Sequence, residues 1–245
     1  MVTTLNETGQ GDNTVVIVTS DHGDMLGDRG LWFKMAFYER SARVPLIMAG
    51  PGVTQGVASE VNSHLDLLPT LLDIASQDGR SRPPELGASL DGHSLWERAT
   101  GGRDHIDETF GEYTAEMTSH PMFMIRRGRH KYIHCDTDPP LLFDLDSDPD
   151  ERTNLAEDPD QGALVRGFAA EVSRRWDSDA IREEVLASQR ARRVLHAAME
   201  TGPLTSWDWF PARDAANEYV RNHIDWSDAG PRSRFPPLPQ VFGSG

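Results

Sequence analysis

Apolar residues in the first part of the chain, residues 1–106, are grouped as in an α/β domain. The run from Thr14 to Thr19 is continuous and rich in β-branched residues, so it predicts a buried strand of a mostly parallel sheet. A second short strand is expected over Leu46–Gly52, where a Gly-Pro-Gly turn closes it. The connection Val53–Asn62 is expected to hold one short strand. Between Leu65 and Ala75 the apolar residues recur at helical spacing, which predicts an amphipathic helix.

The pattern changes to short strands in residues 107–160, which predicts a small antiparallel subdomain. The middle two strands are expected to form a hairpin. His130 and Lys131 are expected on the surface of this hairpin, and a position near the functional site is the alternative. The expected strands are Glu108–Tyr113, Pro121–Arg126, His130–Cys135 and Leu141–Leu145.

Residues 161–245 predict a helical segment and a tail. The periodicity of Gln161–Ala198 indicates two helices, broken near Asp177–Asp179. The aromatic stretch that begins at Trp207 and runs to Trp226 is too apolar for a free tail, and aromatic residues at this density usually mark an interface. The last residues are rich in proline and predict an extended arm.

Composition and net charge limit the number of domains and the kinds of molecule that the chain is expected to bind. The 245 residues suffice for one large or two modest domains, and the net charge of −15 argues against nucleic acid or an anionic membrane as a partner. No apolar run is long enough to span a bilayer, and the N-terminal residues lack the pattern of a secretory signal. Cys135 is the single cysteine, which excludes an intrachain disulfide and fits a cytoplasmic location.

Candidate chemistry follows directly after the run Thr14–Thr19. Ligands of open α/β sheets bind beyond the carboxyl ends of the strands, and Asp21 and His22 stand at this position. In a continuing strand the two side chains would point to opposite faces, but a turn at Gly23 allows both to reach one ion. A carboxylate and an imidazole suit a divalent cation, whereas a helix cap or a turn residue is the alternative interpretation. Lys34 lies in an aromatic run, where it either reaches solvent or binds an anionic oxygen.

Two further polar residues stand at the start of the helix expected over Leu65–Ala75. His64 and Asp66 suggest metal ligands, but a role in helix entry is favoured, because an acidic residue near a helix N-terminus interacts well with the helix dipole.

The strings TSDHGDMLGDRGLWFKM and YERSARVPLIMAGPG closely resemble the second metal-binding segment of sulfatases in the alkaline-phosphatase superfamily, with choline sulfatases as the nearest subfamily. The resemblance implies that Asp21 and His22 bind the catalytic divalent cation and that Lys34 contacts the sulfate ester. On family grounds the ion is expected to be Ca²⁺, although Mn²⁺ and Mg²⁺ also fit these ligands. The phrase LFDLDSDPDERTNL is also widespread in the family, and its acidic residues are interpreted as turn and cap formers.

The resemblance also implies a fold class. The chain is expected to be α/β, with residues 1–106 forming the C-terminal part of an alkaline-phosphatase-like sandwich. Residues 107–160 correspond to the small antiparallel subdomain of sulfatases. Residues 161–245 correspond to a helical segment and the C-terminal tail peculiar to choline sulfatases, which packs on a neighbouring subunit and reaches its active site. A homo-oligomer is therefore expected.

Three residues are candidates for binding the substrate, a small sulfate ester expected to be choline-O-sulfate. Glu112 lies on a strand beside Tyr113, and a carboxylate among aromatic rings suits a quaternary ammonium group. An edge-strand acid facing water is the alternative. By position in the tail, Asp225 is a candidate for facing the trimethylammonium group, and Asn222 is a weaker candidate.

Sulfatases use a formylglycine nucleophile, which is made from the cysteine of a Cys-x-Pro-x-Arg motif, and an Asp-Asp pair that completes the metal site. Neither motif occurs in this sequence, since Cys135 stands in HCDTDPP. The chain is therefore expected to be the C-terminal portion of a longer sulfuric-ester hydrolase, or a truncated reading frame, and to be inactive alone. Formylglycine is expected in the missing N-terminal part.

Two other functions stay open. Many sulfatases carry asparagine where this chain has His22, and Asp-His also occurs in phosphonate monoester hydrolases and related phosphodiesterases of the superfamily. The third hypothesis is a non-catalytic remnant that supplies half a metal site and an oligomerisation tail.

Overall fold

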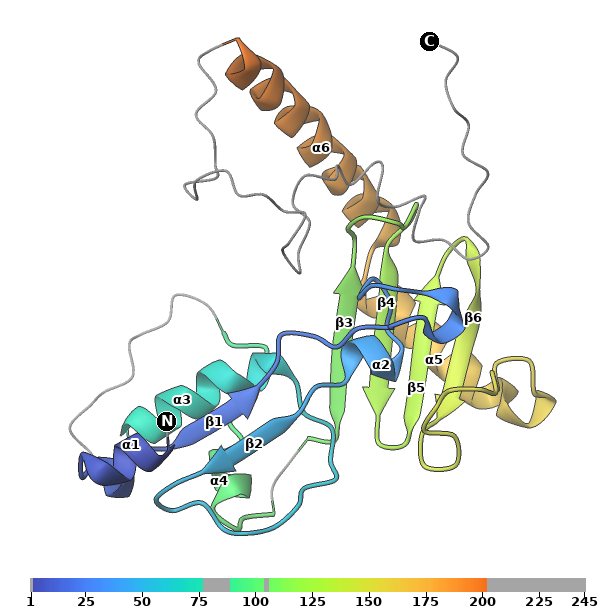
Figure 1. The fold of residues 1–245 in the computed structure, drawn as a ribbon. Coiled ribbons are helices and arrows are strands. Elements are labelled where there is room, and N and C mark those ends of the chain that lie inside the picture. The colour runs from blue at the N-terminus through green and yellow to red at the C-terminus, as the bar shows by residue number, and fades with distance from the viewer. Residues whose placement is uncertain (1, 77–88, 104–105, 202–245) are drawn as a thin grey trace. The chain divides into compact units, whose positions relative to one another are not determined.

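The computed structural model describes residues 2–76, 89–103 and 106–201, and within these ranges the strands form two antiparallel sheets (Figure 1). The residues up to 23, together with 35–182, form one compact unit. Of the described residues, 24–34 and 183–201 belong to a second unit. Both sheets lie in the first unit, and so do Asp21, His22 and Glu112.

The first sheet, called the β1–β2 ladder here, pairs β1 (Val16–Thr19) with β2 (Leu46–Ala49). The ladder is antiparallel, and Val18 and Ile47 are 47% and 58% exposed. The prediction of a buried strand in a mostly parallel sheet is therefore wrong for the described residues. A continuous apolar run identifies a strand, but it carries no information on the direction of the partner strand or on what covers its faces.

Short helices surround the β1–β2 ladder. The expected strand within Val53–Asn62 is absent from the structure, which describes this whole segment as irregular and leaves Val57 98% exposed. The helices of this region are α1 (Val2–Glu7), η1 (Gly11–Asn13), η3 (His64–Asp66), α3 (Leu67–Ser76) and α4 (Trp96–Ala99), whereas α2 (Glu39–Ala42) lies against the second sheet (Figure 1).

The entry of α3 confirms the helix-entry interpretation of Asp66. Its Oδ2 accepts a hydrogen bond of 2.7 Å from the Ser63 N–H, while the Ser63 side chain caps the first turn. Its Oδ1 accepts the N–H of His93 at 2.9 Å, which ties the loop before α4 to the helix. Asp66 is 8% exposed, so both of its carboxylate oxygens serve the backbone.

The second sheet, called the β3–β6 sheet here, contains the four antiparallel strands predicted for residues 107–160. Its strands are hydrogen-bonded in chain order, and Gly128 in the left-handed region closes the hairpin between the middle two. The strands are β3 (Glu108–Tyr113), β4 (Met122–Arg127), β5 (His130–Cys135) and β6 (Asp138–Asp144).

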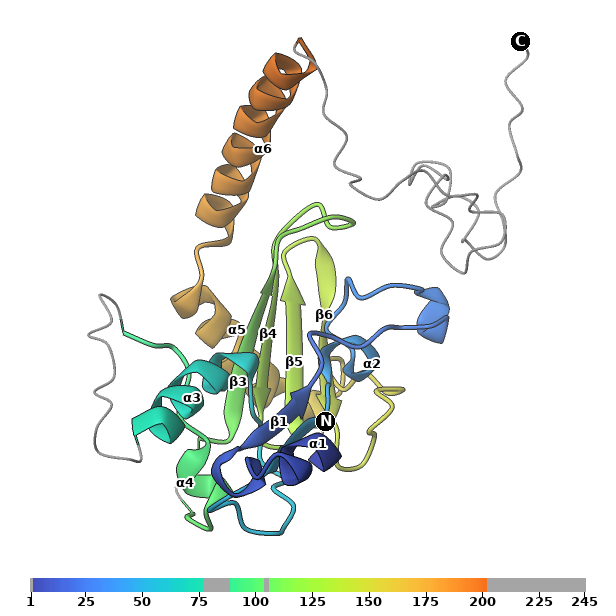
Figure 2. The ribbon, with the colours of Figure 1, turned by 60° about the vertical axis from the view of Figure 1, so that its left-hand side comes forward.

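Both faces of the β3–β6 sheet are covered (Figure 2). On one face Phe123 and Tyr132 pack against α5 (Gly162–Arg175), and the Tyr132 ring stacks on Phe168 at 5.5 Å. On the other face Phe37 and Tyr38, next to α2, pack on a second apolar cluster. That cluster consists of Met124, Ile133, Phe143 and Leu145.

Lys131 lies on the α2 face and is 1% exposed, so its predicted surface position is wrong. Alternation along β5 places Lys131 on the same face as Ile133, and that face is covered by a segment almost a hundred residues earlier in the chain. His130, at the start of the strand, is half-buried.

The two helices predicted over Gln161–Ala198 are confirmed as α5 and α6 (Ser178–Glu200), with η4 (Pro159–Gln161) leading into α5. The chain is extended at Trp176, which ends α5, so the break lies at the predicted position. Among the described helices, none combines the length and apolar character that crossing a membrane requires.

Candidate functional site

The turn after β1 brings Asp21 and His22 together. The strand ends at Thr19, and the Ser20 hydroxyl lies 3.3 Å from Asp21 Oδ1 and 3.0 Å from the His22 carbonyl oxygen. As a result, the two side chains do not point to opposite faces. Asp21 Oδ2 lies 3.1 Å from His22 Nε2.

Gly23 and Ser41 hold this turn in place. The Gly23 N–H donates a hydrogen bond of 2.8 Å to the carbonyl oxygen of Ser41, which is 2% exposed at the end of α2. A Cβ atom on Gly23 would overlap the carbonyl oxygen of Arg40. Glycine is therefore required here by the close approach of two backbones, because any larger residue would push the turn away from α2.

The orientation of His22 suits a metal ligand. Its Nδ1 lies 2.7 Å from the Gly23 carbonyl oxygen, so with the proton on Nδ1 the ring donates there and Nε2 presents its lone pair. A histidine that binds a metal usually donates its other ring nitrogen in this way, which fixes the tautomer and the ring plane. The lone pair then faces Asp21 Oδ2, and two acceptors in contact favour a cation or a proton between them.

Asp21 is suited to the same ion. Its side chain is 81% exposed, and a hydrogen bond from the His22 backbone lowers the pKa of the Asp21 carboxyl group. The carboxylate is therefore charged at neutral pH. Neighbouring ligand atoms of a divalent cation with bonds of about 2.1–2.5 Å lie about 3–3.5 Å apart, and the separation of 3.1 Å between Asp21 Oδ2 and His22 Nε2 falls in this range. Within residues 2–76, 89–103 and 106–201, no three His, Cys, Asp or Glu side chains gather closely enough to hold a metal.

Lys34 ends the loop 24–34, which belongs to the second unit. Hydrogen bonds from Met25 N to Phe33 O (3.1 Å) and from Gly27 N to Leu31 O (2.8 Å) pair the two arms of this loop. Its tip includes η2 (Asp28–Gly30), where Arg29 adopts a left-handed conformation. Lys34 is exposed and has an interaction partner, and its role stays a prediction.

Glu112 is exposed on β3, the edge strand of the β3–β6 sheet. Its carboxylate accepts a hydrogen bond of 2.6 Å from the indole N–H of Trp176, which belongs to the apolar cluster on the α5 face. The neighbouring Gly111 faces Phe37 on the α2 face, so Glu112 and the α2 segment lie on opposite faces of the sheet. The structure does not bring Glu112 to the Asp21–His22 turn. Asn222 and Asp225 lie outside the described residues.

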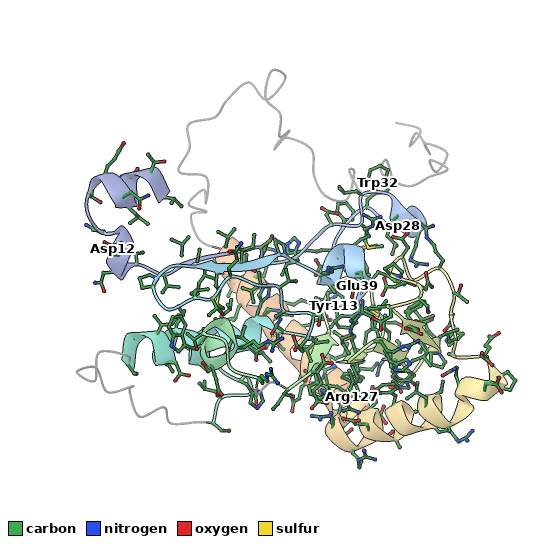
Figure 3. The ribbon with its side chains drawn as sticks, turned by 90° about the horizontal axis from the view of Figure 1, so that it is seen from below. Asp12, Asp28, Trp32, Glu39, Tyr113 and Arg127 are labelled. Atoms are coloured by element: carbon green, nitrogen blue, oxygen red, sulfur yellow. The ribbon has the colours of Figure 1, made fainter. Side chains whose placement is uncertain are left out.

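A buried ion cluster on the α2 face was missed by the sequence reasoning. Lys131, Glu39 and Glu151 meet there, as Figure 3 shows for Glu39 on α2, on the side of the sheet away from Arg127 and α5. A signal for Lys131 was present, since alternation in β5 groups it with the apolar residues Ile133 and Cys135. Glu151 was interpreted as a turn former, and nothing local in the sequence points to its partner.

Two family models match the chain. The model described as "Sulfatase" matches residues 1–77, and the model described as "Choline sulfatase enzyme C terminal" matches residues 183–235. The choline-sulfatase of Rhizobium meliloti (strain 1021) is 41% identical over 240 residues, which cover 96% of this chain and 46% of that protein. The chain belongs to the sulfatase family. It spans about half the length of this curated relative.

Solved structures of sulfatases and phosphonate monoester hydrolases share the fold. A 2-O GAG sulfatase is 30% identical with a TM-score of 0.60, and the match covers 78% of this chain and 40% of that one. The phosphonate monoester hydrolase of Agrobacterium radiobacter is 31% identical with a TM-score of 0.58, covering 70% of this chain and 36% of that one. The fold of this sulfatase family member is thus the α/β, alkaline-phosphatase-like fold expected from the sequence.

Proposed function

We propose that this chain is the C-terminal portion of a sulfuric-ester hydrolase and contributes half of its metal site. The observation that carries the proposal is the Asp21–His22 turn, in which a charged carboxylate and an oriented imidazole converge to 3.1 Å. The similarity to a choline-sulfatase along almost the whole chain supports this reading of the turn.

In the proposed site, Asp21 and His22 hold a divalent cation, with Ca²⁺ favoured over Mn²⁺ and Mg²⁺. A bound divalent cation withdraws charge from the ester oxygens and so favours attack on sulfur. The protein's part is to keep the carboxylate ionised and the imidazole oriented, which the His22 backbone and the Gly23 carbonyl do in the folded chain. Lys34 keeps its assignment as the cation that contacts the sulfate ester.

The nucleophile is proposed to come from other polypeptide. Cys135 is the single cysteine of the chain, and it is 6% exposed on the α2 face of β5. Among the described residues, its thiol contacts the Thr137 hydroxyl at 3.4 Å and the His120 carbonyl oxygen at 4.0 Å, and neither is a cationic group that would activate it. Cys135 is therefore suited to packing, and the formylglycine would be supplied by a Cys-x-Pro-x-Arg segment outside this chain.

The first experiment measures binding of Ca²⁺ and Mn²⁺ to the purified chain by isothermal titration calorimetry. Because two ligands make an incomplete site, weak binding is expected, and it should disappear in Asp21→Asn. An Asp12→Asn variant removes an exposed carboxylate elsewhere and serves as the control. Tight binding of one ion by the isolated chain would contradict the claim that further ligands come from other polypeptide.

The second experiment tests catalysis. The DNA upstream of the Met1 codon is examined for an in-frame segment that encodes the Asp-Asp pair and Cys-x-Pro-x-Arg, and the joined protein is assayed with choline-O-sulfate. Hydrolysis that is lost in Asp21→Asn supports the proposal. A stop codon at this place, with no hydrolysis after pairing with the N-terminal half of the Rhizobium meliloti relative, favours the non-catalytic remnant.

The proposed substrate is choline-O-sulfate, and the proposed assembly is a homo-oligomer formed through the C-terminal tail. The model match over residues 183–235 supports both, since it includes Asn222 and Asp225. In the joined protein, Asp225→Ala should raise KM for choline-O-sulfate much more than KM for a neutral aryl sulfate. Asn222→Ala should have a smaller effect, and equal losses on both substrates would remove Asp225 from the pocket.

A phosphonate monoester hydrolase is the second candidate. It is favoured by His22 and by the similarity to the Agrobacterium radiobacter enzyme. A direct comparison of kcat/KM for an aryl phosphonate monoester and for choline-O-sulfate separates the two. Preference for the phosphonate would reject the sulfatase assignment.

A further inference from the structure

Lys131 is a charged residue inside an apolar layer. It is 1% exposed, and it lies on the face of the β3–β6 sheet that Met124, Ile133 and Phe143 cover with apolar groups. An ammonium group without partners is strongly unfavourable in such a layer. The position is therefore tolerated only because other groups of the chain are brought to the Lys131 nitrogen.

Among the described residues, three acceptors surround Lys131 Nζ. Glu39 Oε1 lies at 2.6 Å, Glu151 Oε1 at 2.8 Å, and the carbonyl oxygen of Phe37 at 2.7 Å. An ammonium group has three donors, so each of them has a partner. Arg126 adds a second positive charge, with its Nη1 4.0 Å from Glu39 Oε1.

The cluster fixes the start of α2. Besides the contact of the Glu39 side chain with Lys131, the Glu39 backbone N–H donates a hydrogen bond of 2.7 Å to Glu151 Oε2. Glu151 is 2% exposed, and both of its carboxylate oxygens are used in this way. The segment from Phe37 to Glu39 is thus tied to the sheet by side-chain and backbone groups together.

The other end of α2 carries the candidate metal turn. Ser41 is 2% exposed, and its carbonyl oxygen accepts the Gly23 N–H at 2.8 Å. Gly23 is packed so closely on Arg40 that no side chain fits there. A movement of α2 would therefore move Gly23, and with it the carbonyl oxygen that orients His22.

We propose that Lys131 is a positioning residue for the Asp21–His22 turn. Through Glu39 and Glu151 it sets the place of α2, and α2 sets the place of Gly23. Lys131 lies more than a hundred residues from this turn in the sequence and does not contact the metal ligands. The importance of the turn for catalysis rests on the proposed function, whereas the mechanical link between Lys131 and Gly23 does not.

The experiment compares two charge removals on opposite faces of one sheet. Lys131→Met keeps an unbranched side chain, one heavy atom shorter, and removes the charge on the α2 face. Arg127→Met removes a charge on the α5 face, where Arg127 binds Glu171 with two hydrogen bonds of 3.0 Å. The readouts are amide hydrogen exchange of Gly23 by NMR, the ring resonances of His22, and global stability in urea for each full-length variant.

In Lys131→Met, the Gly23 amide should exchange faster than in the parent chain. The increase should be at least about tenfold larger than the increase that the loss of global stability alone would cause. The His22 ring resonances should also shift. In Arg127→Met, Gly23 exchange should change only as far as global stability does. Glu151→Gln is the milder second variant, because the amide oxygen still accepts from Lys131, whereas the negative charge and the oxygen that accepts the Glu39 N–H are lost. It should accelerate Gly23 exchange several-fold, and it decides the question if Lys131→Met does not fold.

Unchanged Gly23 exchange and His22 resonances in the folded α2-face variants would overturn the proposal, as would an equal effect in Arg127→Met. These readouts need neither cation nor substrate. The two proposals can also fail separately. If Gly23 exchange responds as expected but Asp21→Asn leaves Ca²⁺ and Mn²⁺ binding unchanged, the positioning role of Lys131 is supported and the proposed function is contradicted.

Discussion

The two sheets of this chain use apolar strands in different ways. The β3–β6 sheet is covered on both faces, with Phe123, Ile125 and Leu142 fully buried under α5 and a second cluster under the α2 segment. The β1–β2 ladder has sequences at least as apolar, yet Val18 and Ile47 are about half exposed. Apolar character alone therefore does not tell how much a strand contributes to stability.

The region with the best-packed core is also not the region that carries the candidate metal ligands. The candidate metal turn follows β1 in the less buried region, and it is held by backbone contacts with α2 rather than by a surrounding core. The well-packed β3–β6 sheet provides the anchor for α2 through Lys131, Glu39 and Glu151. In this arrangement a rigid sheet supports a polar turn that stays accessible to ligands.

The largest expected difference between the two sheets is in the cost of truncating a strand residue. Phe123→Ala removes a ring that is 0% exposed and stacked on Trp176 at 4.7 Å, so it should lower the free energy of unfolding by about 3–5 kcal/mol. Ile47→Ala, at 58% exposure, should cost less than about 1 kcal/mol. Urea unfolding followed by tryptophan fluorescence measures both. Equal losses would mean that the β1–β2 ladder is as well packed as the β3–β6 sheet.

The next effect concerns the backbone contact that holds the turn. Gly23→Ala should cost about 1–3 kcal/mol, because the new Cβ overlaps the Arg40 carbonyl oxygen and the hydrogen bond to Ser41 is lost. Gly56→Ala is the matched control, since open space surrounds that position, and it should leave the free energy of unfolding unchanged or raised by about 0.5 kcal/mol. Thermal unfolding of the two variants shows whether they differ.

A smaller change in the free energy of unfolding is expected when the capping carboxylate of Asp66 is removed. Asp66→Ala removes the acceptor of two backbone N–H groups, from Ser63 and His93, and should cost about 1–2 kcal/mol. Asp12→Ala, an exposed acid in η1, should stay within about 0.5 kcal/mol of the parent chain. Hydrogen exchange of the α3 amides should accelerate in the first variant alone. An unaffected α3 would show that the capping contacts contribute nothing to this helix.

The smallest effect is the pH dependence of the β3–β6 region. Hydrogen bonds from Arg127 lower the pKa of Glu171 in the folded chain, so its contribution to stability is present above the unfolded pKa of about 4.3 and is lost as the pH falls through the folded value. Glu171→Gln should reduce the loss of the free energy of unfolding between pH 6 and pH 3 by about 1 kcal/mol or less. Arg127→Met should reduce this loss by a similar amount. Urea unfolding between pH 3 and pH 6 tests this, and an unchanged slope in both variants would contradict it.

Much of the local structure could be predicted from the sequence. The strands of residues 107–160, the break between α5 and α6, and the helix-entry role of Asp66 are all confirmed. These features depend on alternation, helical spacing and capping residues, which act over a few positions. The position of Asp21 and His22 at a strand end was also visible, and the contact between them required the Gly23 turn that the sequence permitted.

Contacts between residues distant in the sequence could not be predicted from it. The direction of the β1–β2 ladder, the burial of Lys131 and the pairing of Glu112 with Trp176 each depend on a partner tens of residues away or more. A residue's local pattern identifies its face of a strand, but not what will cover that face. For Lys131 the deciding groups were Glu39 and Glu151, whose carboxylates make an ammonium group acceptable in an apolar layer.

The sequence by itself determined most of the strands and the longer helices, the family resemblance and the pair Asp21–His22 as candidate ligands. Only the tertiary structure decided how the two side chains meet, which face of the β3–β6 sheet carries Glu112, and how α2 is held beside the turn. The physical reason is one of range. Secondary structure follows from interactions between near neighbours, whereas burial, charge pairing and backbone contact are set by segments that folding brings together.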